Sequence, residues 1–263
     1  MMTSESNNSS NNIVPGSFGG TGASSVRTAA QEPKREMTRE LLLDVMPGLT
    51  DVQVSRFLIY YDRLITRNYR VNLTRITDPE DVAKKHFADS IIAASMIPEG
   101  ASVVDVGTGA GFPGIPLKLI RPDIDLLLVD SLGKRILFLR ELCNELGLDV
   151  PCVHARAEDA ARQPELRGAF DVTVSRAVAP MNVLSELTTP FLKIGGCSLM
   201  YKGPNADEEL AACTNALREL KCAADIVRFD TDWGSRNIVV FKKLGETPKK
   251  YPRNAGAVEK KPL

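Results

Sequence analysis

The stretch VVDVGTGAGFPGIPLKLI, residues 103–120, decides the fold of this chain. Its first apolar run, residues 103–106, predicts a buried strand, and residues 114–120 have the spacing of a helix. Three alternating glycines from Gly107 onward join the two. Glycines can take positive φ angles and, without a Cβ atom, let a ligand lie against the backbone. The stretch therefore predicts a strand, a ligand-binding loop and a helix, in that order.

The alternation of apolar runs and amphipathic segments continues along the chain. Further strands are expected at residues 125–130, 151–155, 170–175, 196–203, 223–230 and 236–243. Helices are expected between them, as in GKRILFLRELCNELG and MNVLSELTTPFL. Short strands between amphipathic helices imply a parallel sheet covered on both faces. The fold predicted is α/β, with a doubly wound, mostly parallel seven-stranded sheet.

The segments outside this pattern suggest four parts. Residues 1–36 are rich in Ser and Asn and almost without large apolar side chains, so we expect a disordered tail. Residues 37–100 predict a helical N-terminal cap, which includes an amphipathic helix with Asp51 as its N-cap. The predicted strands and their helices form one domain at residues 101–244, and residues 245–263 form a basic C-terminal tail.

Composition limits the classes of partner. Lys plus Arg and Asp plus Glu both total 33, so a nucleic-acid partner has to be bound by a local patch. No apolar run reaches the length of a membrane span, and the five cysteines form no close pair, so we expect a cytoplasmic protein. His86 and His154 stand alone, which predicts no metal site.

The glycine loop fits two ligand classes. Gly109 to Gly114 satisfy the G-x-G-x-x-G pattern of dinucleotide-binding proteins. The loop also follows an acid, Asp105, in the order Asp-x-Gly-x-Gly-x-Gly that ends at Gly111, a pattern associated with S-adenosylmethionine. Asp105 can help to hold the ammonium group of that ligand, whereas it would repel a pyrophosphate. An NAD-dependent oxidoreductase therefore remains an alternative.

Acids and small residues follow the next two strands. Asp130 ends the second strand, where a carboxylate can accept hydrogen bonds from two ribose hydroxyls. Ala157 and Glu158 follow the third strand, where we expect them to contact an adenine ring and its polar edge. Each feature alone also fits a helix cap, but their succession at strand ends favours a nucleoside site.

Several motifs together are highly specific for one family. They are NLT, HFADS, DVGTGAGFPGIPLKL, DSLGKR, RAED, DVTVSRAVAP, KG and the closing KKYPRNAGAVEKKPL. With them the chain resembles the bacterial small-subunit ribosomal RNA methyltransferase G family, also called glucose-inhibited division protein B. The resemblance implies a class I S-adenosylmethionine-dependent methyltransferase that methylates N7 of a guanine in 16S ribosomal RNA, in the decoding-region loop. It also implies cofactor contacts at Gly107, Phe112, Ala157, Glu158 and Arg176.

The chemistry expected needs alignment more than proton transfer. Guanine N7 carries an unprotonated lone pair and can attack a methyl sulfonium without a general base. We therefore expect no catalytic acid or base. Arg176 is expected to position the cofactor carboxylate or the target base, with an ion pair to Asp171 or Asp105 as the structural alternative.

Local basic clusters are expected to bind 16S ribosomal RNA, in the small subunit or its precursor. The enzyme is expected to be a monomer. The residues chosen for this role are Arg135, Lys202, Lys250 and Arg253. A ribosome-assembly factor that binds RNA and keeps S-adenosylmethionine as a structural ligand is the non-enzymatic alternative.

Overall fold

The computed structural model describes residues 36–263. The tail predicted at residues 1–36 lies outside the described residues except for Glu36, so that prediction is not tested. The described residues belong to one compact unit. Among them, none of the helices is both long and apolar enough to cross a bilayer. All five cysteines are described, and all are free thiols.

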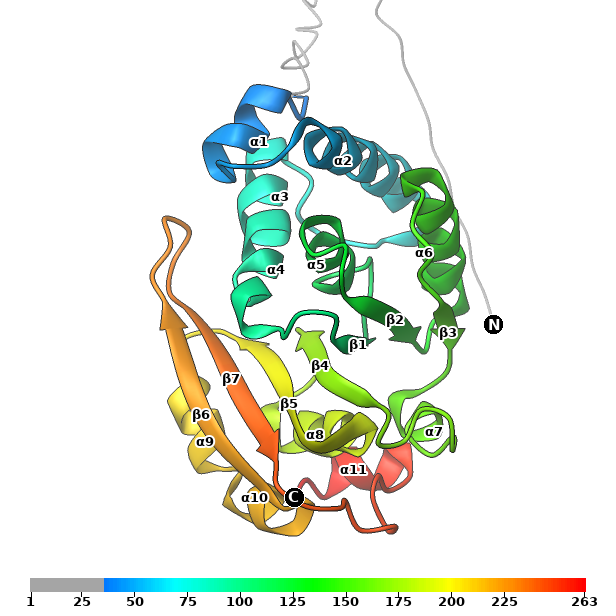
Figure 1. The fold of residues 1–263 in the computed structure, drawn as a ribbon, viewed down its shortest axis with the longest axis vertical. Coiled ribbons are helices and arrows are strands. Elements are labelled where there is room, and N and C mark those ends of the chain that lie inside the picture. The colour runs from blue at the N-terminus through cyan, green and yellow to red at the C-terminus, as the bar shows by residue number, and fades with distance from the viewer. Residues whose placement is uncertain (1–35) are drawn as a thin grey trace, which may run out of the picture. The chain divides into compact units, whose positions relative to one another are not determined.

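One seven-stranded sheet has the order β3-β2-β1-β4-β5-β7-β6 (Figure 1). Its strands are β1 (Ser102–Val106), β2 (Asp125–Asp130), β3 (Cys152–His154), β4 (Phe170–Arg176), β5 (Leu192–Lys202), β6 (Cys222–Phe229) and β7 (Arg236–Lys243). The first five strands are parallel, and β7 runs antiparallel to both β5 and β6. This confirms the predicted sheet. The strand order reverses at β1 and β4, where open α/β sheets bind ligands.

Helices cover both faces of the sheet, as Figure 1 shows. On one face lie α1 (Arg39–Val45), α2 (Asp51–Val71), α3 (Pro79–Val82), the π-helix η1 (Ala83–Ala88), α4 (Asp89–Ile91), the 3-10 turn η2 (Ala94–Met96), α5 (Gly114–Ile120) and α6 (Gly133–Leu146). On the other lie α7 (Ala157–Ala160), α8 (Met181–Thr188), the 3-10 turn η3 (Thr189–Phe191), α9 (Ala206–Ala211), α10 (Thr214–Leu220) and α11 (Ala255–Lys260). The all-helical segment before β1 confirms the secondary structure predicted for the cap.

Side-chain alternation along the strands decides which residues face the cap. In β1, Val103 packs into the core under α5 and α6, whereas Val104 packs into the core of the opposite face. Asp105 follows the first set and lies against Gly114 of α5. The same period of two places Asp130 and Arg176 on the cap side, at the carboxyl ends of β2 and β4.

The long cap helix α2 begins with a capping box. The Thr50 side chain accepts a hydrogen bond from the Gln53 amide, and the Gln53 side chain accepts one from the Thr50 amide. The prediction of Asp51 as N-cap is therefore wrong by one residue, because Thr50 and Gln53 satisfy two free amides reciprocally. Farther along, Phe57 and Tyr60 are fully buried and turn toward the sheet.

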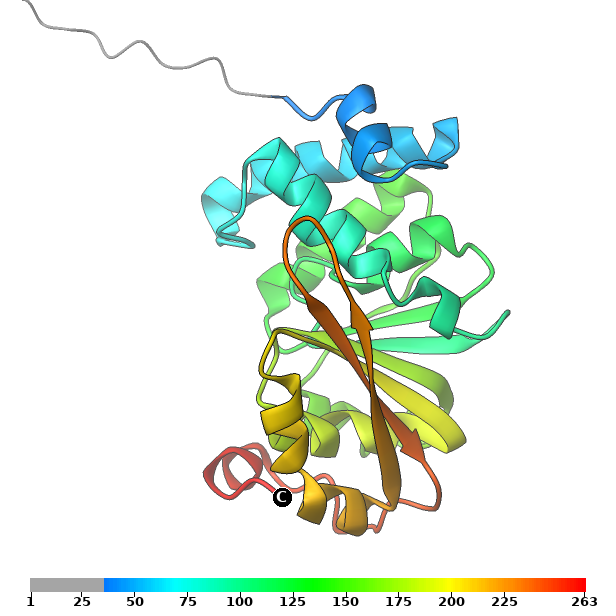
Figure 2. The ribbon, with the colours of Figure 1, turned by 90° about the vertical axis from the view of Figure 1, so that its left-hand side faces the viewer.

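The hairpin of β6 and β7 reaches from the sheet edge to the cap helices, as Figure 2 shows. At its turn, the Trp233 indole donates a hydrogen bond of 3.4 Å to Asp89 of α4. The C-terminal segment also returns to the domain, where Tyr251 and Val258 are buried. Residues 245–263 are thus packed against the sheet domain and do not form the separate tail that their basic composition suggested.

Candidate functional site

Three adjoining hollows lie along the carboxyl edge of β1, β2, β4 and β5. The large cavity, of about 520 Å³, is lined by residues that include Gly107, Asp130, Arg135, Ala157, Glu158, Ala177, Val183, Leu187 and Val258. The loop pocket, of about 270 Å³, is lined by residues that include Thr74, His86, Asp89, Gly107, Gly109, Phe112, Arg135 and Arg176. The arginine pocket, of about 330 Å³, is lined by residues that include Asp89, Arg176, Tyr201, Lys202, Glu209, Arg236 and Asn237. Shared lining residues connect each hollow to the next.

The glycine loop between the large cavity and the loop pocket has the backbone predicted for it. Gly107, Gly109 and Gly111 have φ angles of +73°, +63° and +102°. A Cβ atom on Gly111 would lie 2.6 Å from the Tyr60 hydroxyl, whereas one on Gly109 would meet no atom within 4 Å. Gly111 is therefore required by packing, and Gly109 leaves open space beside the backbone.

Asp105, in β1, holds this loop by hydrogen bonds. Its Oδ2 accepts hydrogen bonds from the Thr108 hydroxyl at 2.7 Å and from the Gly114 amide at 2.8 Å. The side chain is fully buried, and neither the large cavity nor the loop pocket is lined by it. The Asp105 carboxyl group therefore fixes the conformation of the loop, and it does not line the two hollows beside the loop. Burial raises the pKa of Asp105 to about 7, against the lowering effect of its hydrogen bonds.

Asp130 joins the loop to the large cavity. Its Oδ1 accepts a hydrogen bond from the Leu132 amide, and its Oδ2 accepts one from the Gly109 amide, each at 2.9 Å. Arg135 donates to the same Oδ2 at 3.3 Å. The carboxylate thus fixes the middle glycine of the loop while it lines the cavity, in the place expected for a group that binds ribose.

Phe112 of the loop stacks against two rings from the cap. The centres of the Tyr60 and His86 rings lie 5.3 and 4.5 Å from that of Phe112, with interplanar angles of 16° and 18°. The Tyr60 hydroxyl also donates to the carbonyl of Ala110 at 2.6 Å. Tyr60 was not among the predicted site residues, although its spacing from Phe57 and Leu64 on the apolar face of α2 is a usable signal.

His86 is neutral and engaged at both ring nitrogens. Burial, followed by the charge of Arg176, lowers the pKa of His86 to about 4. Its Nδ1 lies 3.3 Å from a nitrogen of Arg176, which can only donate, so Nδ1 accepts and Nε2 carries the proton. Nε2 therefore donates to the Thr74 hydroxyl at 2.7 Å. This arrangement gives His86 a structural role between the cap and Arg176.

Arg176 lies where the loop pocket meets the arginine pocket. Its Nη1 donates to Asp89 at 2.8 Å and to the backbone carbonyl of Lys85 at 3.2 Å, and its guanidinium lies 5.0 Å from the centre of the Phe112 ring. The predicted ion-pair partners were wrong: Asp171 instead pairs with Lys193. The partner comes from the cap because Arg176 faces that side of the sheet.

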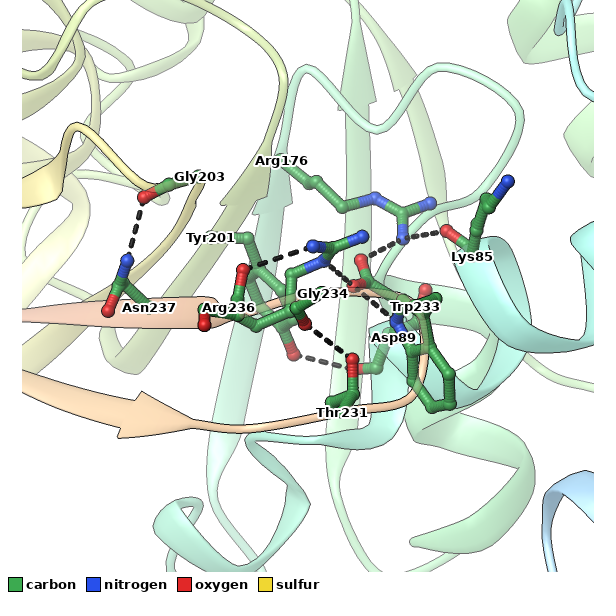
Figure 3. Close-up of polar contacts among 12 residues, drawn as sticks. Lys85, Asp89, Arg176, Tyr201, Gly203, Thr231, Trp233, Gly234, Arg236 and Asn237 are labelled. Carbon is green, nitrogen blue, oxygen red and sulfur yellow. Dashed lines mark hydrogen bonds and ion pairs between the residues drawn. The ribbon is translucent and has the colours of Figure 1, made fainter.

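Asp89 holds two arginines at once, as Figure 3 shows. Its Oδ2 accepts from Arg176, and its Oδ1 accepts from Nε of Arg236 at 2.5 Å and from Trp233. The carboxylate is only 5% exposed, so both guanidinium groups have a buried counter-charge. Sequence reasoning named neither Asp89 nor Arg236 as a site residue. The HFADS motif that contains Asp89 was the available signal.

The far end of the large cavity is mainly apolar. Ala157 begins α7 directly after β3, and Val183 and Leu187 of α8 pack together with it. Glu158 lies in the same wall and is 7% exposed. An apolar surface with a carboxylate at its margin suits the face and the amino edge of a purine, which is the role predicted for Ala157 and Glu158.

The four residues predicted to bind RNA differ in how far their side chains are exposed to solvent. Lys202 donates to the Ala179 carbonyl and to Glu209, at 2.8 and 2.7 Å. Arg253 is paired with the fully buried carboxylate of Glu186. Lys250 pairs with Glu219 but remains exposed to solvent.

Arg135, the fourth residue, lines both the large cavity and the loop pocket, and its side chain is one-third exposed. All four residues pair with carboxylates, but the side chains of Lys250 and Arg135 are 63% and 33% exposed, whereas those of Arg253 and Lys202 are 25% and 9% exposed. Within residues 36–263, no three His, Cys, Asp or Glu side chains are grouped to hold a metal ion.

Asp105 and His86 are expected to give opposite dependences of stability on pH. The raised pKa of Asp105 means that its ionisation destabilises the fold as the pH rises from about 4 to about 7. The lowered pKa of His86 means that stability is lost as the pH falls from 6.5 to about 4. Each effect reaches on the order of 3 kcal/mol, so the two largely cancel between pH 4 and 6.5.

Single variants should reveal the two opposing effects. Relative to the parent chain, Asp105→Asn should gain free energy of unfolding as the pH rises from 4 to 6.5, and His86→Gln should lose it. The measurement is urea unfolding at several pH values. Parallel curves for both variants and the parent would contradict the assignment.

The chain is similar to known proteins along most of its length. A family model described as GidB, rRNA small subunit methyltransferase G, matches residues 53–238. A protein from Clostridium kluyveri, named ribosomal RNA small subunit methyltransferase G, is 47% identical to this chain, over 80% of this chain and 90% of that protein. In Lactobacillus delbrueckii subsp. bulgaricus the identity is 47% over 87% of this chain and 99% of that protein.

Solved structures share the fold at low sequence identity. A putative O-methyltransferase from Klebsiella pneumoniae aligns with a TM-score of 0.52 and 15% identity, over 80% of this chain and 97% of that one. A methyltransferase from Pyrococcus furiosus aligns with a TM-score of 0.50 and 15% identity, over 72% and 99%. The sheet order and these likenesses confirm the predicted class I methyltransferase fold.

Proposed function

Because the chain belongs to the rRNA small subunit methyltransferase G family, we propose that it methylates N7 of one guanine in 16S ribosomal RNA. It is an S-adenosylmethionine-dependent methyltransferase, as the sequence analysis predicted. The family match and the 47% identity favour neither the oxidoreductase nor the assembly factor.

The large cavity is the observation that carries the proposal. It joins an apolar end at Ala157 to a carboxylate at Asp130 and to the glycine loop at Gly107. Adenine, ribose and the amino-acid part of S-adenosylmethionine require these surfaces in this order. In the adjoining loop pocket, the space beside Gly109 admits a ligand against the backbone. The residues present thus fit the cofactor. When bound, S-adenosylmethionine supplies an electrophilic methyl group on a positively charged sulfur.

The side chains beside the loop support methyl transfer without a general base. His86 has both ring nitrogens in hydrogen bonds, and Asp105 is buried away from the two hollows that adjoin the loop. Guanine N7 needs no deprotonation before it reacts. Arg176, held by Asp89 and by the face of Phe112, is suited to orient a ligand and to tolerate a charge that moves during the reaction.

The accessible cations indicate how RNA would be held. Arg135 and Lys250 keep exposed surface, while Lys202 and Arg236 line the arginine pocket next to Arg176. We propose that Arg135 and Lys250 bind phosphates and that the arginine pocket receives part of the target nucleotide. Binding through phosphates should weaken steeply as salt concentration rises. We further propose a monomeric cytoplasmic enzyme that requires no bound metal.

A labelling experiment tests the reaction. The protein is incubated with radiolabelled S-adenosylmethionine and small subunits that lack the modification, and the product is cleaved with borohydride and aniline before reverse transcription. We expect label and a cleavage stop at a single guanine. Label without cleavage would refute N7 as the acceptor, and tight cofactor binding without label would favour the assembly factor.

A further inference from the structure

The C-terminal segment is fastened to the domain by three arginines. Arg167 donates to the backbone carbonyl of Tyr251 at 2.9 Å, and Arg162 donates to that of Pro252 at 2.7 Å. Arg253 donates through its backbone amide, at 2.6 Å, and through its guanidinium to the carboxylate of Glu186 in α8. Backbone carbonyls that accept hydrogen bonds from side chains of the domain fix the path of the C-terminal segment.

The pairing with Glu186 makes this attachment costly to break. Glu186 is fully buried, and its side-chain hydrogen bonds in the described part of the chain all come from Arg253. Release of the segment would leave a carboxylate uncompensated within α8, which is strongly unfavourable. The segment therefore behaves as part of the folded domain.

Beyond these anchors, α11 returns to the large cavity. Val258 is fully buried and packs against Val183 and Leu187 of α8. Val258, Glu259 and Pro262 all line the cavity, in company with Ala157 and Glu158. The apolar end of the cavity therefore has walls from three separate parts of the chain, and α11 supplies the last of them.

We propose that α11 forms one wall of the adenine subsite, with Val258 anchoring that wall against α8. This inference rests on the proposed function, because it takes the large cavity as the site of S-adenosylmethionine. Because Val258 is buried against α8, the wall is fixed before the ligand arrives, and binding carries little cost in ordering it. The C-terminal segment is thereby a binding element for the nucleoside.

Point variants of the full chain test the proposal by calorimetry with S-adenosylhomocysteine. Val258→Ala should weaken binding about threefold to tenfold, and Val258→Asp, which puts a charge into the apolar wall, by more than about tenfold. Lys260→Ala is the matched control, since Lys260 is exposed on the same helix and does not line the cavity. It should bind with unchanged affinity. Thermal unfolding confirms that each variant is folded.

Methylthioadenosine distinguishes the adenine end from the amino-acid end of the site. It contains the adenosine of the cofactor but lacks the amino-acid part, so Val258→Ala should weaken both ligands by the same factor. Unchanged binding of both ligands by Val258→Ala, or a loss confined to S-adenosylhomocysteine, would overturn the proposal and leave the proposed function standing. If the parent chain binds neither ligand, the proposed function itself fails.

Discussion

Arg176→Ala is expected to lower kcat/KM for methylation of small subunits by at least about a hundredfold, while the fold is retained. The described hydrogen bonds of Arg176 use its two terminal nitrogens, and among residues 36–263 no acceptor binds its Nε. That nitrogen is thus available for a ligand beside the glycine loop. The guanidinium also covers one side of Phe112, so its removal takes away both a donor and a positioning surface.

Arg176→Lys is the matched variant, because it keeps the charge and loses the planar fork. We expect an activity between those of the parent and the alanine variant. Steady-state kinetics and urea unfolding measure activity and stability separately. Full activity of Arg176→Ala would refute the positioning role, and a collapse of the fold would instead make Arg176 a structural residue.

Asp89→Ala is expected to cause the largest loss of stability, about 3–5 kcal/mol, because two guanidinium groups lose their buried counter-charge. It should also reduce methylation nearly as much as Arg176→Ala, since Arg176 loses the bond that sets its direction. Asp89→Asn keeps a hydrogen-bond acceptor and should be milder in both respects. Urea unfolding and the methylation assay provide the two readouts.

Asp207→Ala is the control for the loss of a carboxylate from an arginine pair. Asp207 pairs with Arg228, but both side chains are at least 60% exposed. An exposed pair contributes at most about 1 kcal/mol, and this one lies outside the lining of the three hollows. Equal destabilisation by Asp89→Ala and Asp207→Ala would contradict the importance assigned to Asp89.

The glycine loop and the sheet could be predicted because their signals are local. A loop that needs positive φ angles at alternate positions has few solutions other than glycine, and seven apolar runs at regular spacing predict seven strands. Asp130 and Arg176 end two parallel strands, so they lie at one edge of the sheet irrespective of how the cap helices pack. For this reason the predicted location of the site depends on the strand order alone, whereas individual contacts depend on distant parts of the chain.

The contacts of Arg176 and Arg253 could not be read from the sequence. Asp89 precedes Arg176 by 87 residues, and Glu186 precedes Arg253 by 67. The composition gives the number of positive charges, but it does not say which of them will form an ion pair with a distant carboxylate in the folded protein. The C-terminal segment therefore seemed a basic tail, although Glu186 and two arginines of the domain fix its position.

The stack of Tyr60, Phe112 and His86 makes the cap and the glycine loop one mechanical unit. Tyr60 and His86 belong to the helices before the sheet, and Phe112 belongs to the loop. A ligand that shifts those helices must therefore also shift the loop, and the coupling is reciprocal by thermodynamic necessity. If RNA binds to these helices, it will change the affinity for the methyl donor by a certain factor. The methyl donor will then change the affinity for RNA by the same factor.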